Sequence, residues 1–166
     1  DQNSYVFTID LYDFATLQKK STLFSTQHFS EIQSIDSYSF DKEEKKILIA
    51  SNSEYIFRRS FTADFFVYDI PSKKFQKITD KKIQEPLFSP DGKKVAYVFE
   101  NNLYVYDLDT KSETQITTDG KKNHIINGIT DWVYEEEFAF VRAFEWNKTG
   151  EKIAYLKFDE TEVPEF

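Results

Sequence analysis

Three adjacent glutamates follow an aromatic-rich stretch in the run Asp131-Trp132-Val133-Tyr134-Glu135-Glu136-Glu137. Taken alone, a run of like charges is most often a solvated face. Here Trp132, Tyr134 and Phe138 flank the acids, and such rings are expected to be at least partly buried, which would restrict where the carboxylates point. Neighbouring like charges raise one another's pKa and are costly without a cation. The run therefore predicts a cation site, filled either by Arg58 or by a ligand.

Several other site chemistries lack the residues that they need. The chain has no cysteine, so neither a disulfide nor a thiolate metal site can form. Its four glycines, at positions 92, 120, 128 and 150, do not match the spacing of a dinucleotide fingerprint, a P-loop or a nucleophile elbow. His28 and His124 have no partner at metal-ligand spacing. We therefore predict no metal and no cofactor.

The composition predicts an all-β fold. The 166 residues are enough for one ordinary domain with a hydrophobic core. They include 17 Phe, 10 Tyr and 2 Trp against four Gly and four Pro, and aromatic side chains favour the half-buried surface of a sheet. The formal net charge of −8 has the wrong sign for a phosphate backbone, so no nucleic-acid partner is expected. No apolar run reaches the roughly 18 residues of a membrane helix, so no membrane span is predicted.

Three segments of the chain align with one another: Phe40–Ala50, Phe88–Val98 and Trp146–Leu156. Each segment contains the end of one strand, then a polar turn, and then a second, apolar strand. In the second copy the turn is Pro90-Asp91-Gly92, in which proline presets φ, aspartate caps the turn and glycine takes a positive φ. The copies begin 48 (88 − 40) and 58 (146 − 88) residues apart.

A second pattern recurs between these copies. Val67–Ile70 precedes Gln76–Thr79, and Val105–Leu108 precedes Thr114–Thr117 at an offset of 38 (105 − 67). Four strands per unit at a period of about 40 to 50 residues are typical of β-propeller blades. A β-sandwich with similar hairpins is the alternative, but both halves recur in the same order, as repeats require. We predict antiparallel four-stranded units at about 38–78 and 87–116.

The chain begins and ends out of phase with this repeat. Residues 5–24 correspond to the last two strands of a unit, and residues 144–158 to the first two. Two full and two half blades cannot close a ring of about four to eight blades. The prediction is therefore a partial β-propeller, with residues 1–166 an excerpt of a longer protein. Its open strand edges and blade faces are expected to cause homo-oligomerisation or strand-edge association.

Two insertions interrupt the repeat. The middle hairpin of the first full unit spans 18 positions (68 − 50) against 8 (106 − 98) in the second, and the excess contains Phe57–Phe61. The other insertion, of ten residues (58 − 48), lies between Thr117 and Arg142 and contains the three glutamates. Insertions into single repeats decorate one face, often the binding face. We expect Glu136 and Glu137 to approach Arg58 on one face, and a short helical turn is allowed at about 132–137.

The second insertion resembles the dipeptidyl peptidase IV family. The stretch Gly128–Glu137 is similar, nearly residue for residue, to the family's double-Glu motif. The likeness continues through Trp146–Gly150 and Phe158–Pro164, which resemble the segment after that motif. Upstream, Arg58–Ala63 resembles the family's arginine-containing propeller hairpin. The match is weak from about residue 5 and strong from 124 to 164.

The resemblance implies that Glu136 and Glu137 bind the free α-ammonium of a peptide substrate and that Arg58 holds a substrate backbone carbonyl. Glu135 is expected to be structural or solvated. The implied whole protein is a serine exopeptidase: an eight-bladed propeller followed by an α/β-hydrolase domain with a Ser-Asp-His triad, which releases N-terminal X-Pro or X-Ala dipeptides. That second domain is absent from residues 1–166, so no catalytic residue is assigned and this stretch alone is expected to be inactive. Peptides with a free N-terminus are the implied partners.

Several points stay open at the level of sequence. Phe57 and Arg59 stand where the resemblance leads us to expect Trp and His, and Phe138–Val141 is looser than the family pattern, which bears on subsite preference. The Lys-, Ile- and Phe-rich composition suggests a bacterial source, and a periplasmic, secreted or cell-surface location follows from the resemblance alone. A tripeptidyl relative is one alternative. Another is a non-enzymatic propeller whose acidic cluster recognises a basic partner protein.

Overall fold

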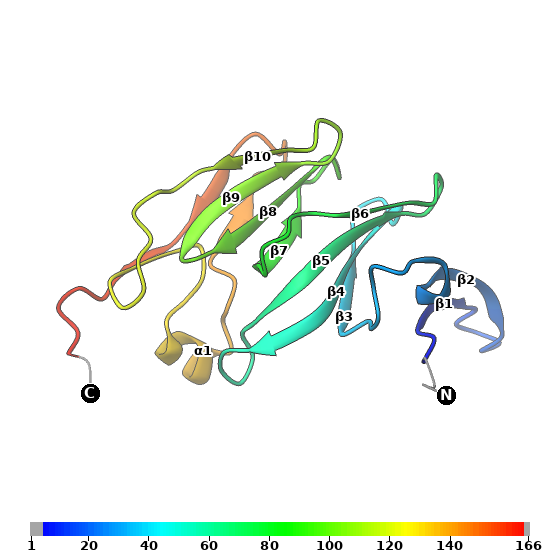
Figure 1. Cartoon of the computed structure of the whole chain (residues 1–166), viewed down its shortest axis with the longest axis horizontal. Helices are drawn as coiled ribbons and strands as arrows, with labels where there is room; N and C mark the ends of the chain where they lie inside the picture. Colours follow the sequence, from blue (N-terminus) through cyan, green and yellow to red (C-terminus); the bar gives the residue numbers. More distant parts are fainter. Residues whose placement is uncertain (1–4, 165–166) are drawn as a thin grey trace.

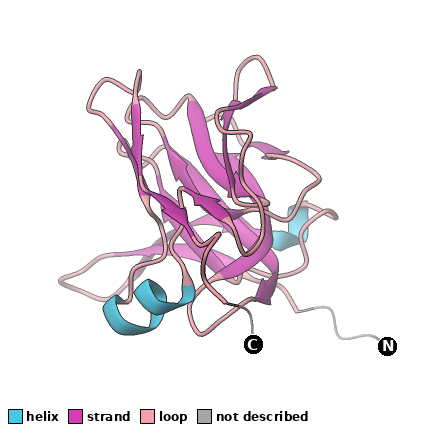
Figure 2. Ribbon diagram, turned by 90° about the vertical axis from the view of Figure 1, so that its left-hand side faces the viewer, coloured by secondary structure: helices cyan, strands magenta, loops and turns pink. Residues whose placement is uncertain are grey.

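A computed structural model describes residues 5–164, which form a row of antiparallel sheets with one short α-helix and one 3-10 turn (Figure 1). Both helical segments lie outside the sheets (Figure 2). Within these residues no helix is long and apolar enough to cross a membrane. The elements are β1 (Thr8–Tyr12), β2 (Lys19–Ser25), η1 (Thr26–His28), β3 (Ser37–Phe40), β4 (Lys46–Tyr55), β5 (Phe61–Asp69), β6 (Lys74–Lys77), β7 (Gln84–Phe88), β8 (Lys94–Phe99), β9 (Asn102–Asp107), β10 (Ser112–Gln115), β11 (Ile125–Asn127), α1 (Trp132–Phe138), β12 (Phe144–Trp146), β13 (Ile153–Tyr155) and β14 (Lys157–Asp159).

Two four-stranded sheets form the centre of the row, in the orders β3-β4-β5-β6 and β7-β8-β9-β10. All neighbouring strands in them are antiparallel. The predicted units at about 38–78 and 87–116 are thereby confirmed. The two sheets are equivalent in register, since Lys46 of β4 pairs with Asp69 of β5, and Lys94 of β8 pairs with Asp107 of β9.

The polar turn after the first strand of each unit is closed by a side chain. Asp41 Oδ1 accepts hydrogen bonds from the amides of Lys45 and Lys46 at 2.7 and 2.8 Å. In the last copy Asn147 Oδ1 accepts from Glu151 N and Lys152 N, both at 3.0 Å. A short polar side chain that satisfies turn amides favours this geometry. The recurrent turn in the sequence therefore corresponds to one recurrent local structure.

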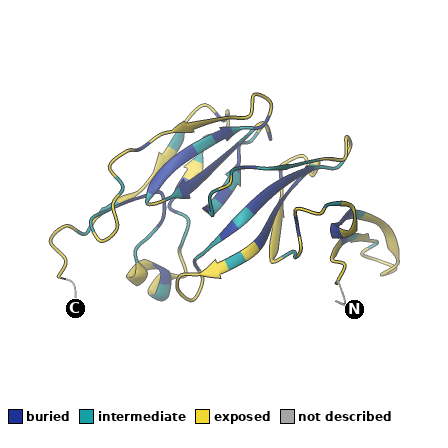
Figure 3. Cartoon of the chain, in the orientation of Figure 1, coloured by how far each residue is buried: buried dark blue, intermediate teal, exposed yellow. Residues whose placement is uncertain are grey.

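Alternate residues of the central strands pack against different neighbouring sheets. In β4, Leu48 belongs to the core between the two full units, whereas Ile47 and Ile49 belong to the core shared with β1 and β2. In β8, Tyr97 faces the first core, while Val98 packs with β11 and β12. Side chains alternate across a strand, so a central sheet that is covered on both faces needs a continuous apolar run. Figure 3 shows this burial along β4, β5, β8 and β9.

Half units lie at the two ends of the row, as predicted. β1 pairs with β2, and β12 pairs with β13. The last expected strand is different, because β13 ends at Tyr155 and residues 157–159 leave this sheet as β14. β14 pairs instead with β11, which precedes the acidic insertion. The predicted boundary of 144–158 for the last half unit was therefore too long.

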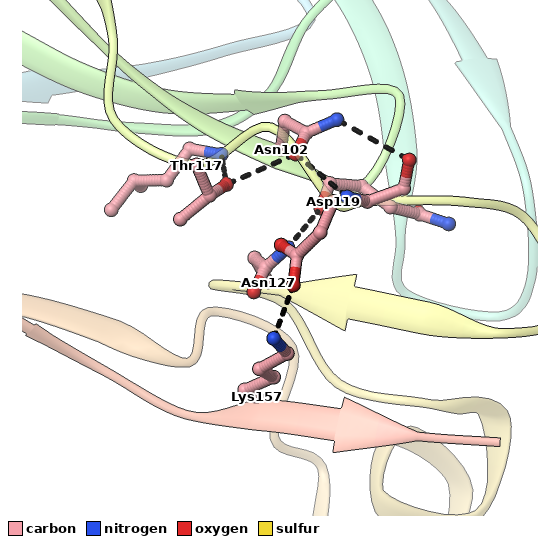
Figure 4. A network of polar contacts seen from close by, with 8 residues as sticks. Asn102, Thr117, Asp119, Asn127 and Lys157 are labelled. Atoms are coloured by element: carbon pink, nitrogen blue, oxygen red, sulfur yellow. Dashed lines mark hydrogen bonds and ion pairs between the residues drawn. The ribbon is translucent and has the colours of Figure 1, made fainter.

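A network of polar side chains joins the β11-β14 sheet to the second full unit (Figure 4). Asn127 of β11 donates from Nδ2 to Asp119 Oδ1 at 3.0 Å, and Lys157 of β14 pairs with the same carboxylate. Asn102 of β9 accepts a hydrogen bond from Thr117 Oγ1 at 3.1 Å. Asn127 Nδ2 also donates to a main-chain carbonyl of the loop before β9, at 3.2 Å. The base of the second insertion is thus fixed to the sheet that it follows.

Candidate functional site

The first insertion is a long hairpin that extends beyond the body of its sheet. β4 continues to Tyr55 after an irregularity in register between Ser51 and Glu54, and β5 begins at Phe61. The five residues between the strands, 56–60, are called the arginine loop below. A hydrogen bond of 2.9 Å from Ile56 N to Ser60 O closes it. The loop presents Arg58 at its tip, where its side chain is 73% exposed.

The second insertion forms α1, a helix of seven residues, Trp132–Phe138. Asp131 is its N-cap and accepts a hydrogen bond from Tyr134 N at 2.8 Å. Such a cap satisfies one of the free amides of the first turn. The helix ends at Ala139, whose left-handed φ of 53° lets its amide bond back to the helix carbonyls. The three glutamates therefore lie on a helical turn at about the predicted place, and they point in different directions around its axis.

Glu135 is buried, with 2% of its surface exposed. Its Oε1 accepts hydrogen bonds from the amides of Arg59 at 2.7 Å and Ser60 at 2.9 Å. These partners lie 76 and 75 residues away in the sequence, in the arginine loop. The expectation that Glu135 is structural or solvated is thus resolved as structural: its carboxylate joins the two insertions.

Glu136 and Arg58 meet as predicted. Arg58 Nε lies 3.3 Å from Glu136 Oε2, and the Glu136 side chain is only 20% exposed. Glu137 is exposed, and within residues 5–164 its carboxylate has no hydrogen bond or ion pair. The structure therefore brings Arg58 next to one of the two predicted ammonium-binding acids, while the other points into solvent beside them on the same helix.

Burial and hydrogen bonding act in opposite directions on Glu135. Burial raises its pKa, but hydrogen bonds from Ser60 and Arg59 outweigh burial and hold the pKa below the ordinary value of 4.5. The net shift at Glu135 is therefore downward, opposite to the increase in pKa expected for adjacent like charges. Glu85 shows the reverse balance: burial raises its pKa, Arg142 opposes this only in part, and the charge of Glu135 raises it further.

The aromatic residues of α1 are less buried than their type suggested. Trp132 is 56% exposed and Phe138 is 68% exposed. Tyr134 is also exposed, although its ring contacts those of Phe138 and Phe158 at centroid distances of 5.4 and 5.1 Å. The expectation that these rings fix the carboxylates is therefore wrong. The geometry of α1 is set instead by its two caps and by the buried Glu135.

A cavity of about 730 Å³ is lined in part by residues of both insertions. Ser60, Trp132 and Glu135 form part of its wall, together with Asn102 and Glu160. Arg58, Glu136 and Glu137 are not among its lining residues. The three predicted site residues therefore lie outside the cavity, close in sequence to residues of its wall.

Sequence reasoning left Glu135 open between a structural and a solvated role, and it missed the environment of Glu85. The Glu135 carboxylate binds main-chain amides, and a main-chain partner leaves no residue type to recognise in a sequence. Glu85 lies in β7 with a φ of 50° and is 3.9 Å from Arg142, a pair that joins the second unit to the chain after α1. One signal in the sequence could have separated Glu135 from the other two acids. It lies four residues after the N-cap Asp131, so its side chain leaves the helix axis in a different direction from those of the next two acids.

Comparison with known proteins gives concordant matches. Residues 41–166 match the family model described as the dipeptidyl peptidase IV (DPP IV) N-terminal region. The chain is 37% identical over 169 residues to dipeptidyl peptidase 4 of Felis catus, a match that covers 99% of this chain and 21% of that protein. It is 34% identical over 158 residues to dipeptidyl aminopeptidase B of Saccharomyces cerevisiae, covering 95% of this chain and 19% of the yeast protein.

The same relationship is seen in three dimensions. A crystal structure of Porphyromonas gingivalis dipeptidyl peptidase 4 superposes with a TM-score of 0.87 at 35% identity, covering 93% of this chain and 23% of that one. The row of four-stranded units is accordingly part of a β-propeller, as predicted. The chain spans about a fifth of the length of the curated relatives named above. Its sequence and its fold agree, and the chain belongs to the dipeptidyl peptidase IV N-terminal region family.

Proposed function

We propose that this segment binds the free N-terminus of peptide substrates in a serine dipeptidyl aminopeptidase. In this proposal Glu136 and Glu137 bind the substrate α-ammonium, and Arg58 holds a backbone carbonyl of the same peptide. The complete protein releases N-terminal X-Pro or X-Ala dipeptides with a Ser-Asp-His triad outside these residues. We also propose a periplasmic, secreted or cell-surface location, on the basis of the family resemblance.

The observation that carries the proposal is the unequal engagement of the three glutamates. Main-chain amides satisfy Glu135, and Glu136 has one contact of 3.3 Å with a largely exposed arginine. Glu137 is exposed and has no partner among the described residues. Arg58 balances one of the two remaining charges, so one negative charge is left for a cation. A substrate ammonium has that charge and can donate to both carboxylates.

Hydrogen bonds to the carboxylates of Glu136 and Glu137 favour a positively charged ligand. Hydrogen bonds to charged groups contribute about 1.5–3 kcal/mol each. Only a free amine can supply an ammonium to both acids, and an acylated N-terminus cannot. If the amine is held at a fixed place, the second peptide bond lies at a fixed distance from it. Release of dipeptides then follows from positioning of the substrate and needs no further chemistry in this segment.

The alternative of an acidic surface for a basic partner protein fits this arrangement less well. Long-range attraction of a basic partner needs several solvated charges of one sign. Here one acid is buried, the second contacts an arginine, and two arginines stand in the adjacent loop. The site is local and of mixed charge, which suits a small ligand that offers both an ammonium and a carbonyl.

A substrate series tests the proposal in the complete enzyme. X-Pro reporters with a free amine, an acetylated amine or no amine should differ in kcat/KM by about 100-fold or more, because the last two lose charge-assisted bonds. An ester that acylates the serine without an amine should be turned over by the same preparation. Equal turnover of all three peptides would contradict an ammonium site.

A further inference from the structure

We propose that Glu135 is a positioning residue for substrate binding: its buried carboxylate fixes the arginine loop against α1 and so sets the distance from Arg58 to Glu136 and Glu137. The inference rests on the proposed function and deepens it. Glu135 itself touches no substrate in this account. Its action passes through the loop main chain to Arg58 and through the helix to the two acids that follow it.

The hydrogen bonds of Glu135 hold the two insertions in one relative orientation. A single carboxylate oxygen, Oε1, accepts from two consecutive amides, at 2.7 Å from Arg59 N and 2.9 Å from Ser60 N. Consecutive amides that converge on one oxygen define the orientation of the peptide between them. The first of these two amides, Arg59 N, belongs to the peptide bond that joins Arg58 to Arg59, so the carboxylate holds the main chain directly after Arg58.

Little else holds the tip of the loop. Residues 56–59 are exposed, and the bonds that close the loop, from Ile56 N and Phe57 N to Ser60 O, are at 2.9 and 3.4 Å within the loop itself. For the described residues, hydrogen bonds and ion pairs between the arginine loop and α1 come only from Glu135 and Glu136. The Arg58–Glu136 contact is a single one, its arginine side chain is 73% exposed, and an ion pair with such an exposed partner holds geometry weakly. The buried contact of Glu135 is therefore the one that fixes the loop.

On the other side of this contact, both ends of helix α1 are held by caps. α1 is capped by Asp131 at one end and closed by Ala139 at the other. Residues in one helix cannot move independently, so a displacement of Glu135 also displaces Glu136 and Glu137. A misplacement of about 1 Å in a binding group can cost about 100-fold in rate. The carboxylate of Glu135 is already satisfied by amides, so it does not compete with its neighbours for the substrate ammonium.

The test uses the complete enzyme with Glu135→Ala, Glu135→Asp and Glu135→Gln, and with Glu43→Gln as a control at an exposed turn acid. Glu135→Asp keeps the charge but shortens the side chain by one methylene group. The loop and the helix should therefore shift relative to each other while the carboxylate still contacts the loop amides. We expect KM for free-amine X-Pro peptides to rise by about 10- to 100-fold in Glu135→Ala and Glu135→Asp. Turnover of an amine-free ester should stay within about twofold of the parent. Glu135→Gln, which keeps an acceptor, should recover most of the loss.

A double-mutant cycle separates positioning from a general effect on the fold. If Glu135 acts through Arg58, the loss caused by Glu135→Asp should shrink in an Arg58→Ala background. A loss of the same size in that background, shared by the ester substrate, would show a general structural role and overturn the inference. Unchanged peptide kinetics in both Glu135→Ala and Glu135→Asp would overturn it too. If Glu135→Ala does not fold, Glu135→Asp and Glu135→Gln still decide the question.

Glu136→Gln distinguishes failure of this inference from failure of the proposed function. If Glu136→Gln loses activity on free-amine peptides and Glu135→Asp does not, the ammonium site stands and the positioning role of Glu135 is wrong. If Glu136→Gln leaves those peptides unaffected, the proposed function fails, and the positioning role fails with it.

Discussion

At the scale of single residues, the three glutamates of α1 differ in environment although they are adjacent. Glu135 is buried on main-chain amides, Glu136 lies beside Arg58, and Glu137 is in solvent. A helix turns by about 100° per residue, so neighbours in sequence face different surroundings. One acid can therefore hold the structure together while the next two remain available for a ligand.

The lowered pKa of Glu135 predicts a pH-dependent contribution to stability. A carboxyl whose folded pKa is lowered stabilises the fold above its unfolded pKa, and the stabilisation is lost as pH falls through the folded pKa. We expect the complete protein to have a higher Tm than its Glu135→Gln variant at neutral pH. The difference should shrink as pH falls below the ordinary value of 4.5. Thermal scans of both proteins across this range would check it, and a difference that grows in acid would contradict the assigned shift.

Arg58 should matter less than the acids. In the proposal it holds a neutral carbonyl, and a hydrogen bond with one charged partner is weaker than a pair of opposite charges. Arg58→Ala should lower kcat/KM for free-amine peptides by about 3- to 30-fold, which is a smaller loss than that of Glu136→Gln. Steady-state kinetics with Lys148→Ala as an exposed-cation control would measure this. A larger loss in Arg58→Ala than in Glu136→Gln would reverse the assigned roles.

At the scale of elements, the recurrent turns also join neighbouring units. Gly92, in the turn of the second full unit, has a φ of +65°, and a Cβ there would lie 2.8 Å from Asp41 Oδ2 in the equivalent turn of the first unit. Asp41 is itself occupied by the amides of its own turn. Glycine is therefore required both by the left-handed backbone and by the close approach of the adjacent unit.

Gly92→Ala should destabilise the protein by about 1–3 kcal/mol, because left-handed strain and crowding against Asp41 add together. Lys93→Ala, at the next and exposed position of the same turn, is the matched control and should change stability by less than about 0.5 kcal/mol. Denaturant unfolding of the three proteins gives both numbers. Equal stability of Gly92→Ala and the parent would show that the turn can move away from Asp41.

The elements were predictable to different degrees. The two full units followed from the sequence because turn residues and apolar runs recur in a fixed order. β11 and β14 did not, since strands of three residues without a turn between them have no periodic pattern. Arg58 and Glu136 were placed correctly from opposite charges within two insertions. The sequence left Glu135 open between a structural and a solvated role, because its partners are main-chain amides, and the exposed Trp132 shows that residue type alone is a poor guide to burial at an insertion.

At the scale of the whole molecule, the described sheets form an open row and do not close on themselves (Figure 1). Apolar side chains near its first sheet are exposed, among them Tyr5, Leu17 and Phe14, the last at 97%. Unpaired strand edges and exposed apolar faces both favour association. In a propeller these surfaces are covered by further blades.

Produced alone, residues 1–166 should therefore self-associate at micromolar concentration. Light scattering after size exclusion should give a mass above that of the monomer, because edge strands and apolar faces of separate copies pair with one another. A monodisperse monomer that unfolds cooperatively would show that the two full units form an independent domain, and it would contradict this expectation.

The proposed ammonium site is tested most directly by Glu136→Gln and Glu137→Gln in the complete protein. Each change keeps the shape of the side chain and removes one negative charge. Each should lower kcat/KM for a free-amine X-Pro peptide by about 10- to 100-fold, equivalent to about 1.4–2.7 kcal/mol of lost charge-assisted binding, while an amine-free ester is spared. If both variants cleave the free-amine peptide as well as the parent does, the segment holds no ammonium site and Glu137 is simply a solvated acid.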